Sequence, residues 1–315
     1  MIGKSWIREQ GLQDPLMVEA LRKRGMQDVP LWETTYPGQE ALAAEKDAAI
    51  KHWNDMLPHR DGPVSSNQIE VTDRHAMSDE IKKRSLEAGG TDVGITALRP
   101  EFIELGVELP HDNVIAIICK EDYRRALEGP LAVEHEAMSA YARCADVSTV
   151  IARYIREELG YPALAHHNAS FQIQAIPVFQ AVGFGELGRH GSLIHPELGA
   201  NFRPGFITTT LPLAYDKPIE FGVQEYCENC NLCRANCPGD AIPDDFIVTG
   251  DTKRWLTNID KCYPISRFSE AYCHICIDVC PYIHKENGDV EKRAMFKQYM
   301  KVRKDEGYKS PKRNA

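Results

Sequence analysis

The cysteines constrain this chain more than any other feature, because eight of the ten lie within residues 227–281. The first run reads C-x2-C-x2-C-x3-C-P, and after one isolated cysteine a second run reads C-x2-C-x3-C-P. In this spacing three cysteines of a run bind one [4Fe–4S] cluster and the fourth binds the other. We therefore predict two clusters, the first held by Cys227, Cys230, Cys233 and Cys280 and the second by Cys237, Cys262, Cys273 and Cys276.

A zinc site or a set of disulfides would be the alternatives for these cysteines. Structural zinc usually draws on two C-x2-C pairs, whereas the C-x3-C-P ending occurs twice here. The pattern therefore favours iron–sulfur clusters. About 220 residues precede the array, far more than a ferredoxin needs, so we expect the clusters to carry electrons to a chemical site upstream.

Composition narrows the class of protein. A length of 315 residues predicts about two domains, and a net charge of -9 argues against a nucleic-acid-binding surface. No window has the ~20 apolar residues of a membrane span, and the first residues show neither an apolar signal segment nor a twin-arginine pair. Since thiolate-bound clusters suit a reducing compartment, we expect a soluble, cytoplasmic protein.

Hydrophobic periodicity predicts the main elements. It favours helices over Pro15–Arg24, Gln39–Met56, Met77–Gly90 (with Ser78 as N-cap) and Glu134–Leu159, and a short helix ending at Val182. Strands are predicted near residues 93–96, 113–119 and 205–213. Residues 1–70 contain no recognisable catalytic or binding motif. We interpret them as a packing extension or a dimer arm; a lid over a pocket is the more specific and less favoured alternative. The basic tail is interpreted as a solvated helix, or alternatively as a docking patch for an acidic electron donor.

Three features of the middle of the chain are ambiguous from pattern alone. Tyr141 lies on the inward stripe of the helix 134–159, where a core tyrosine is commoner than a catalytic one. His166-His167-Asn168 follow in a loop, and adjacent histidines diverge, which disfavours a shared metal. The G-x-G-x-x-G run from Gly183 follows a helix and lacks the later acidic residue of a dinucleotide site. Its glycines would instead permit tight turns or close approach to a large flat ligand.

Four blocks resemble the reductive dehalogenase family over residues 75–285: 183–199, 209–213, 216–227 and 254–262. The resemblance implies a cobalamin and two [4Fe–4S] clusters. It also implies an α+β fold, in which a nitroreductase-like cobalamin-binding core (71–222) follows a helical extension (1–70). A two-cluster domain like bacterial ferredoxin (223–290) and the basic tail (291–315) complete the expected order. Epoxyqueuosine reductase is a more distant resemblance with the same cofactors.

The resemblance also assigns roles to single residues. Tyr141, in a Tyr-x-Arg pattern, matches the proton donor of the family, Arg203 matches a basic partner and Asn168 a pocket residue. Cobalamin contacts are expected from Gly183, Gly185, Gly188, Arg189, His190, Gly191, Thr209 and Leu211. The Asp-x-His-x-x-Gly signature of a protein histidine ligand is absent after Asp73, which implies base-off cobalamin without a protein lower ligand. Thr210 stands where the family has an aspartate.

The expected function is therefore reductive dehalogenation of an organohalide. Electrons would pass from a ferredoxin or flavodoxin through the two clusters to give cob(I)alamin. Tyr141 would then donate a proton, its pKa lowered by the charge of Arg203. The alternatives are a cobalamin-dependent reductase of a non-halogenated substrate, such as an epoxide or a modified nucleoside, and an electron-transfer protein that reduces the corrinoid of a partner. The substrate, the reductant and the oligomeric state are not specified by the sequence.

Overall fold

The computed structural model describes residues 38–104, 106–168, 170, 172–250, 252–266 and 272–283, with 297, 298 and 301. The predicted helix Pro15–Arg24 lies outside these residues, as does nearly all of the basic tail. Within the described part of the chain, no helix combines the length and the apolar character that crossing a bilayer requires.

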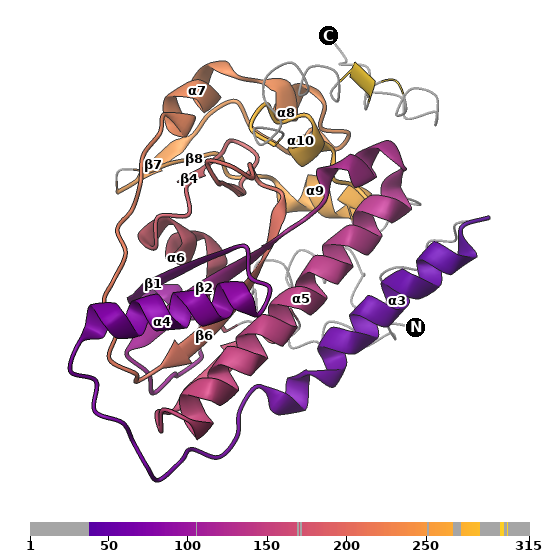
Figure 1. The fold of residues 1–315 in the computed structure, drawn as a ribbon. Helices are drawn as coiled ribbons and strands as arrows, with labels where there is room; N and C mark the ends of the chain where they lie inside the picture. The colour runs from indigo at the N-terminus through magenta and orange to yellow at the C-terminus, as the bar shows by residue number, and fades with distance from the viewer. Residues whose placement is uncertain are drawn as a thin grey trace.

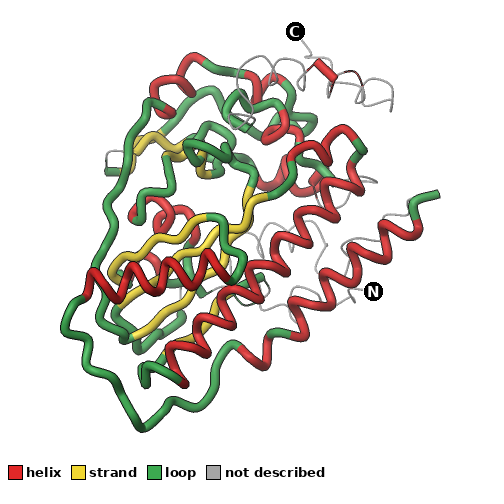
Figure 2. The backbone as a smooth tube through the Cα atoms, in the orientation of Figure 1, coloured by secondary structure: helices red, strands yellow, loops and turns green. Residues whose placement is uncertain are grey.

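An antiparallel sheet of four strands forms the centre of the fold (Figures 1 and 2). Its order is β1 (Asp92–Ala97), β2 (Asn113–Lys120), β6 (Phe202–Thr209) and β3 (Ala163–His166). The two strands predicted near residues 93–96 and 113–119 are confirmed. The third begins earlier than predicted, at Phe202, and ends at Thr209. It ends there because the Thr209 hydroxyl turns back to donate to the Pro162 carbonyl, 2.7 Å away, and Pro212 could not continue the ladder.

Side-chain alternation along the strands divides the core between the two faces of the sheet. Ile115 and Ile117 of β2 pack with helices α4 (Arg74–Glu87) and α5 (Pro130–Glu157). Val114 and Ile118, one position out of phase, pack with Phe179 of α6 (Ala175–Ala181). The predicted short helix ending at Val182 is thereby confirmed as α6. The sheet is thus covered on both faces, as its nearly continuous apolar strands require.

Helix α5 is longer than its apolar stripe predicts. It begins at Pro130, four residues before the predicted start, with Gly129 as N-cap at φ 105°. Proline is favoured at the first helical position because the amide that it lacks would have no partner there. The helix ends at Glu157, and Gly160, at φ 76°, turns the chain towards β3.

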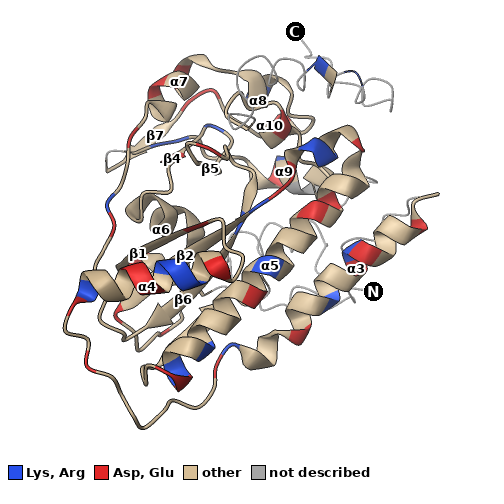
Figure 3. Cartoon of the chain, in the orientation of Figure 1, with Lys and Arg blue, Asp and Glu red and all other residues tan. Residues whose placement is uncertain are grey.

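The predicted N-cap of α4 is wrong. The helix starts at Arg74, and Asp73 is the cap, its carboxylate accepting hydrogen bonds from the backbone amides of His75 and Ala76. Ser78 is instead buried inside the helix, where its hydroxyl donates to the carbonyl of Ala214 and accepts from its amide. Acidic and basic side chains are mixed along α4 (Figure 3), and pairs such as Glu80–Arg84 support its solvent face.

Helix α3 (Glu40–Asp55) confirms the prediction for residues 39–56 and lies alongside α5 (Figure 1). Trp53 packs against Ala137, Met138 and Ala145 of α5. Lys46 and Glu134, both almost fully buried, form an ion pair of 3.5 Å between the two helices. The 3₁₀ turns are η1 (Leu57–His59), η2 (Pro100–Phe102) and η3 (Tyr123–Leu127).

Short elements make up the remaining described residues. The glycine-rich run forms a small hairpin, β4 (Glu186–Leu187) and β5 (Leu193–Ile194). The cysteine-rich segment comprises α7 (Val223–Asn229), α8 (Leu232–Ala235), the hairpin β7 (Ile247–Thr249) and β8 (Thr252–Arg254), α9 (Ile259–Ser266) and α10 (Ile275–Asp278). Such short elements leave much of this segment in loops, where cysteines can converge.

Candidate active site

Tyr141 and Arg203 are brought together where α5 crosses the first residues of β6. The guanidinium carbon of Arg203 lies 5.1 Å from the centroid of the Tyr141 ring. One turn further along α5, the Cys144 thiol donates to the Arg203 carbonyl, 3.1 Å away. Two of the three residues predicted to be catalytic are therefore neighbours, and the thiol ties the arginine backbone to the helix that carries the tyrosine.

Arg203 is held from two further directions. Its Nε donates to Oε1 of Glu121, which follows β2 directly, and its Nη2 lies 3.4 Å from the hydroxyl of Tyr272. Burial alone would lower the pKa of Arg203, but Glu121, Tyr272 and Tyr141 outweigh this and raise it well above the ordinary value. The side chain is 18% exposed and carries a permanent positive charge beside Tyr141.

The contacts around Arg203 continue into the cysteine-rich segment through Tyr272. His274 stacks on the Tyr272 ring at a centroid distance of 6.1 Å. Its Nδ1 is 3.0 Å from an oxygen of Asp278, and its Nε2 is 4.0 Å from Oε2 of Glu121. Because Tyr272 and His274 flank Cys273, the Tyr141–Arg203 pair is connected through side chains to the predicted ligands of the second cluster.

Trp53 closes the group from α3. Its ring meets the ring of Tyr141 edge-on, with the centroids 5.8 Å apart, and the side chain is 4% exposed. The indole Nε1 is buried and has no hydrogen-bond partner among the described residues. A donor in this position would gain an acceptor from a bound molecule.

Asn168 lies in the loop after β3, and its carbonyl is 3.1 Å from Nδ1 of His167. Continuing the β3–β6 register beyond the pair His166–Phe206 places this loop alongside the first residues of β6, which carry Arg203. No side-chain contact of Asn168 with Tyr141 accompanies this placement in the described residues, so its pocket role stays a prediction.

The cysteines predicted for the first cluster are Cys227, Cys230, Cys233 and Cys280, and they lie close enough for their charges to act on Cys280. Burial raises the pKa of the Cys280 thiol to about 12, and the charges of the other three thiols of this set contribute to the rise. Cys227 and Cys280 also pack in one apolar cluster with Trp255. The backbone amide of Arg189 lies 3.5 Å from Sγ of Cys227, the kind of hydrogen bond that tunes cluster potentials.

Three cysteines predicted for the second cluster pack in one apolar cluster. Burial raises the pKa of Cys276 well above its ordinary value, and the charges of Cys273, Cys262 and Cys237 contribute together with that of Cys233 from the first set. Cys237, Cys273 and Cys276 pack around Val279 and Ile275, and the amide of Ala241 lies 3.3 Å from Sγ of Cys237. In the described ranges, no three histidine, cysteine, aspartate or glutamate side chains are grouped so as to hold a single metal ion.

In the glycine-rich run, Gly183, Gly185 and Arg189 have structural roles within the chain. A Cβ on Gly183 would lie 2.3 Å from the Lys217 carbonyl oxygen, and one on Gly185 only 1.9 Å from that of Ile194. These two glycines, both at positive φ, are therefore required by the packing of the chain itself. Arg189 is fully engaged, since its guanidinium donates to the carbonyls of Cys227, Glu228, Pro243 and Asp244.

His190 differs from its neighbours because half of its ring is unpaired. Its Nδ1 accepts from the Ser192 amide, while Nε2 is buried without a partner in the described structure. Burial, followed by the charge of His274, lowers the pKa of His190 to about 4. Thr257 Oγ1, likewise buried and unpaired in the described ranges, faces Gly191, whose Cβ would meet it at 3.3 Å. His190 and Thr257 thus place two buried, unsatisfied polar atoms beside Gly188 and Gly191.

Thr209 and Leu211, also predicted as cobalamin contacts, lie at the opposite end of β6 from Arg203. The Thr209 hydroxyl donates to Pro162 and accepts from the Leu211 amide, and Leu211 is fully buried in the core with Ile207. Their contacts are with the chain itself, and their role towards a cofactor stays a prediction.

Four residues of the site escaped prediction: Trp53, Glu121, Tyr272 and His274. Only the position of Tyr272 and His274 on either side of Cys273 offered a signal. In the sequence, Glu121 is the first acidic residue after a predicted buried strand, and Trp53 is one of several apolar residues on a loosely periodic helix. Neither pattern distinguishes a site residue from a structural one.

Comparison with known proteins gives relatives of two kinds. No family model matches the chain. A tetrachloroethene reductive dehalogenase of Dehalobacter restrictus is 30% identical over 227 residues, 67% of this chain and 40% of the relative. One from Sulfurospirillum multivorans is 36% identical over 150 residues, 45% and 29% respectively. An epoxyqueuosine reductase of a Synechococcus species is 27% identical over 270 residues, 69% of this chain and 80% of the relative.

Solved structures share the fold. A catabolic reductive dehalogenase in complex with 3-bromo-4-hydroxybenzoic acid superposes with a TM-score of 0.71 at 23% identity, over 85% of this chain and 42% of that chain. A reductive dehalogenase structure, described with a mechanism for B12-dependent dehalogenation, gives 0.70 at 23% identity, over 87% and 44%. This identity supports the fold alone. The chain spans about 40% of the length of the dehalogenases that it matches.

Proposed function

Since the chain is a homologue of the reductive dehalogenases, we propose that it is an oxidoreductase that uses cobalamin and two [4Fe–4S] clusters to remove halide from an organohalide. In this proposal residues 71–222 form the nitroreductase-like cobalamin core and residues 223–290 the ferredoxin-like domain. The extension 1–70 and the tail 291–315 flank them. The observation that carries the proposal is the Tyr141–Arg203 pair, which is connected through Tyr272 to the segment that holds the predicted cluster ligands.

The residues present fit the clusters. The sequence supplies eight cysteines in the two predicted sets of four, and soft thiolate donors suit iron–sulfur clusters. The amides of Arg189 and Ala241 supply hydrogen bonds to sulfur. A cytoplasmic location follows in this proposal, because such ligands need reducing surroundings.

The residues present also fit a large polar cofactor beside the glycine-rich run. His190 Nε2 and Thr257 Oγ1 are buried and unpaired in the described structure, so a polar cofactor could supply the partners that both atoms lack. These residues would hold cobalamin, in the base-off form without a protein lower ligand. When bound, the cobalamin would supply a cobalt centre that takes electrons from the clusters and reacts with the carbon–halogen bond.

The protein side chains then perform the proton chemistry. The overall reaction is R–X + 2 e⁻ + H⁺ → R–H + X⁻, and the proton comes from the Tyr141 hydroxyl to the carbon that loses halide. The positive charge of Arg203, 5.1 Å from the ring centre, stabilises the negative charge left on the tyrosine oxygen. Glu121 and Tyr272 keep the guanidinium in place. A ferredoxin or flavodoxin would supply the electrons.

The test is Tyr141→Phe in protein reconstituted with cobalamin, iron and sulfide. We expect the visible and electron-paramagnetic spectra to retain both cofactors while halide release falls by a factor of about 10² to 10⁴, the usual contribution of a general acid. Undiminished halide release would remove Tyr141 from the mechanism. Absence of cobalamin binding by the wild type would end the proposal as a whole.

A second candidate is a cobalamin-dependent reductase of a non-halogenated substrate, as in epoxyqueuosine reductase. It is favoured by one observation, that this chain covers 80% of the length of such a relative. Incubation under the same reducing conditions with an epoxide-bearing nucleoside and with halogenated phenols separates the two. Reduction of the epoxide without halide release would replace the first candidate by the second.

A further inference from the structure

Glu121 is one of the most firmly placed side chains near Arg203. Its amide donates to the Asn201 carbonyl, and the Asn201 side chain donates back to its carbonyl, each at 2.9 Å. The carboxylate is 4% exposed, pairs with Arg203 Nε through Oε1 and has His274 Nε2 4.0 Å from Oε2. Asn201 lies only two residues before Arg203, so the acid and the arginine are fixed by the same stretch of backbone.

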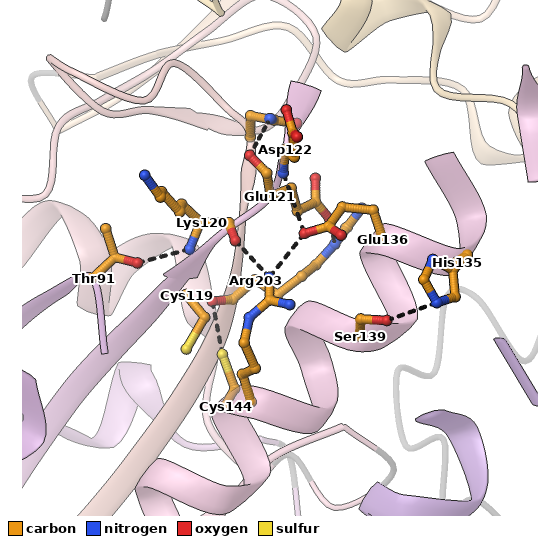
Figure 4. A network of polar contacts seen from close by, with 12 residues as sticks. Thr91, Cys119, Lys120, Glu121, Asp122, His135, Glu136, Ser139, Cys144 and Arg203 are labelled. Atoms are coloured by element: carbon orange, nitrogen blue, oxygen red, sulfur yellow. Dashed lines mark hydrogen bonds and ion pairs between the residues drawn. The ribbon is translucent and has the colours of Figure 1, made fainter. Parts of the chain in front are cut away.

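This pairing sets the charge of the site. Arg203 would be an attractive partner for a carboxylate ligand, but its charge is already balanced by a buried Glu121. The neighbouring arginine on α5, Arg143, is likewise balanced, since its Nη2 lies 2.9 Å from Oε1 of Glu136. Figure 4 labels Glu121, Glu136 and Arg203 in this part of the molecule. An incoming anion would have to compete with Glu121 and would meet its like charge. The uncharged side chains nearby are aromatic, namely Trp53, Tyr141 and Tyr272.

The geometry points to a neutral organohalide as the substrate, with Glu121 as the residue that excludes anionic analogues such as halobenzoates. This inference rests on the proposed function but concerns recognition rather than chemistry. A flat, uncharged halide would lie against the aromatic rings beside an arginine that stays paired. Glu121 acts here through Arg203 and is a positioning and specificity residue.

The experiment compares two ligands of nearly equal shape, 4-bromobenzamide and 4-bromobenzoate, binding to the reconstituted protein without a reductant. Calorimetry gives each Kd, and tryptophan fluorescence, to which Trp53 contributes, gives a second readout. For the wild type we expect the amide to bind at least about tenfold more tightly than the benzoate. In Glu121→Gln the freed Arg203 should strengthen benzoate binding by about tenfold or more, the value of one charge-assisted hydrogen bond. The amide should change by less than about threefold.

Two variants serve as controls. Glu121→Asp keeps the negative charge and should retain the wild-type preference. Glu80→Gln removes a carboxylate from the Glu80–Arg84 pair on the solvent face of α4 and should leave both Kd values unchanged. Circular dichroism and the cofactor spectra check that each variant is folded.

The outcomes separate this inference from the proposed function. Equal affinity of the wild type for both ligands, binding of neither, or an unaltered preference in a folded Glu121→Gln protein would overturn the role of Glu121. Equal halide release from both compounds under reduction would refute the charge preference and leave dehalogenation standing. If the amide binds more tightly as predicted but no halide is released, the charge preference stands and dehalogenation is refuted.

Discussion

Arg203 stacks over Tyr141, with its guanidinium carbon 5.1 Å from the ring centroid, while its Nε is paired with Glu121. The tyrosine comes from the middle of a long helix and the arginine from the start of a strand 62 positions later. The helix supplies Cys144 to hold the arginine carbonyl, so the relative position of the two side chains is fixed by backbone as well as by charge. This pair is the basis of the first prediction.

Replacement of Arg203 should reduce turnover without removing the cofactors. Arg203→Ala leaves the charge on the reacting Tyr141 oxygen unsupported and Glu121 buried without its partner, so we expect kcat to fall by about 10² or more. Arg203→Lys keeps the charge but not the planar fork and should recover only part of the rate. Single-turnover halide release, with cluster and cobalamin spectra recorded on the same samples, measures both. Equal rates for the alanine variant and the wild type would contradict the role of the charge.

The cysteines give a prediction that iron analysis can check. Cys276→Ala should lose the second cluster, so that iron falls from about eight to about four atoms per chain, the content of one [4Fe–4S] cluster. Cys119→Ala is the control, because Cys119 is a buried cysteine of β2 that belongs to the core. Iron loss from both variants would indicate a general folding defect.

The Lys46–Glu134 pair should be important for docking α3 on α5. Lys46→Met removes the Lys46 cation from beside the Glu134 carboxylate, which is 1% exposed. We expect the free energy of unfolding, measured in urea, to fall by about 3 kcal/mol. The double variant Lys46→Met with Glu134→Leu should regain much of this loss, since no charge remains buried. Lys51→Met, at an exposed pair with Asp55 on the same helix, should cost less than about 1 kcal/mol.

His167 should make stability fall in mild acid. It is fully buried, and burial lowers its pKa to about 4, against about 6.5 in the unfolded chain. Between these values the unfolded state binds more protons, so stability is complete above pH 6.5 and declines as the pH falls towards 4. Urea titrations measure the free energy of unfolding at pH 7.5 and 5.0. Its decrease between these two pH values should be about 2 kcal/mol smaller in His167→Gln than in the wild type. The exposed His59, replaced in the same way, should leave the dependence intact.

Several elements were predictable because their signals are local. The strands β1 and β2 and the helices α3 and α6 match their apolar patterns. The predicted cap of α4 failed because Asp73 and Ser78 are both good caps by type, and only the packing of Ser78 against Ala214 decided between them. The start of α5 at Pro130 was not predicted, because the first turn of this helix precedes the regular apolar stripe on which the prediction of a helix over 134–159 was based.

The cysteine spacing by itself determined that two sets of four thiols can form, and residues that resemble a known family placed Tyr141 and Arg203 as candidates. The tertiary structure alone decided what surrounds them. Glu121 and Arg203 are 82 residues apart and Arg203 and Tyr272 are 69 apart, distances over which neither periodicity nor spacing carries information. Ligand runs are read along the chain because short turns fix their geometry. The pairing of Arg203 with Glu121 and Tyr272 forms only when the sheet, α5 and the cysteine-rich segment pack together.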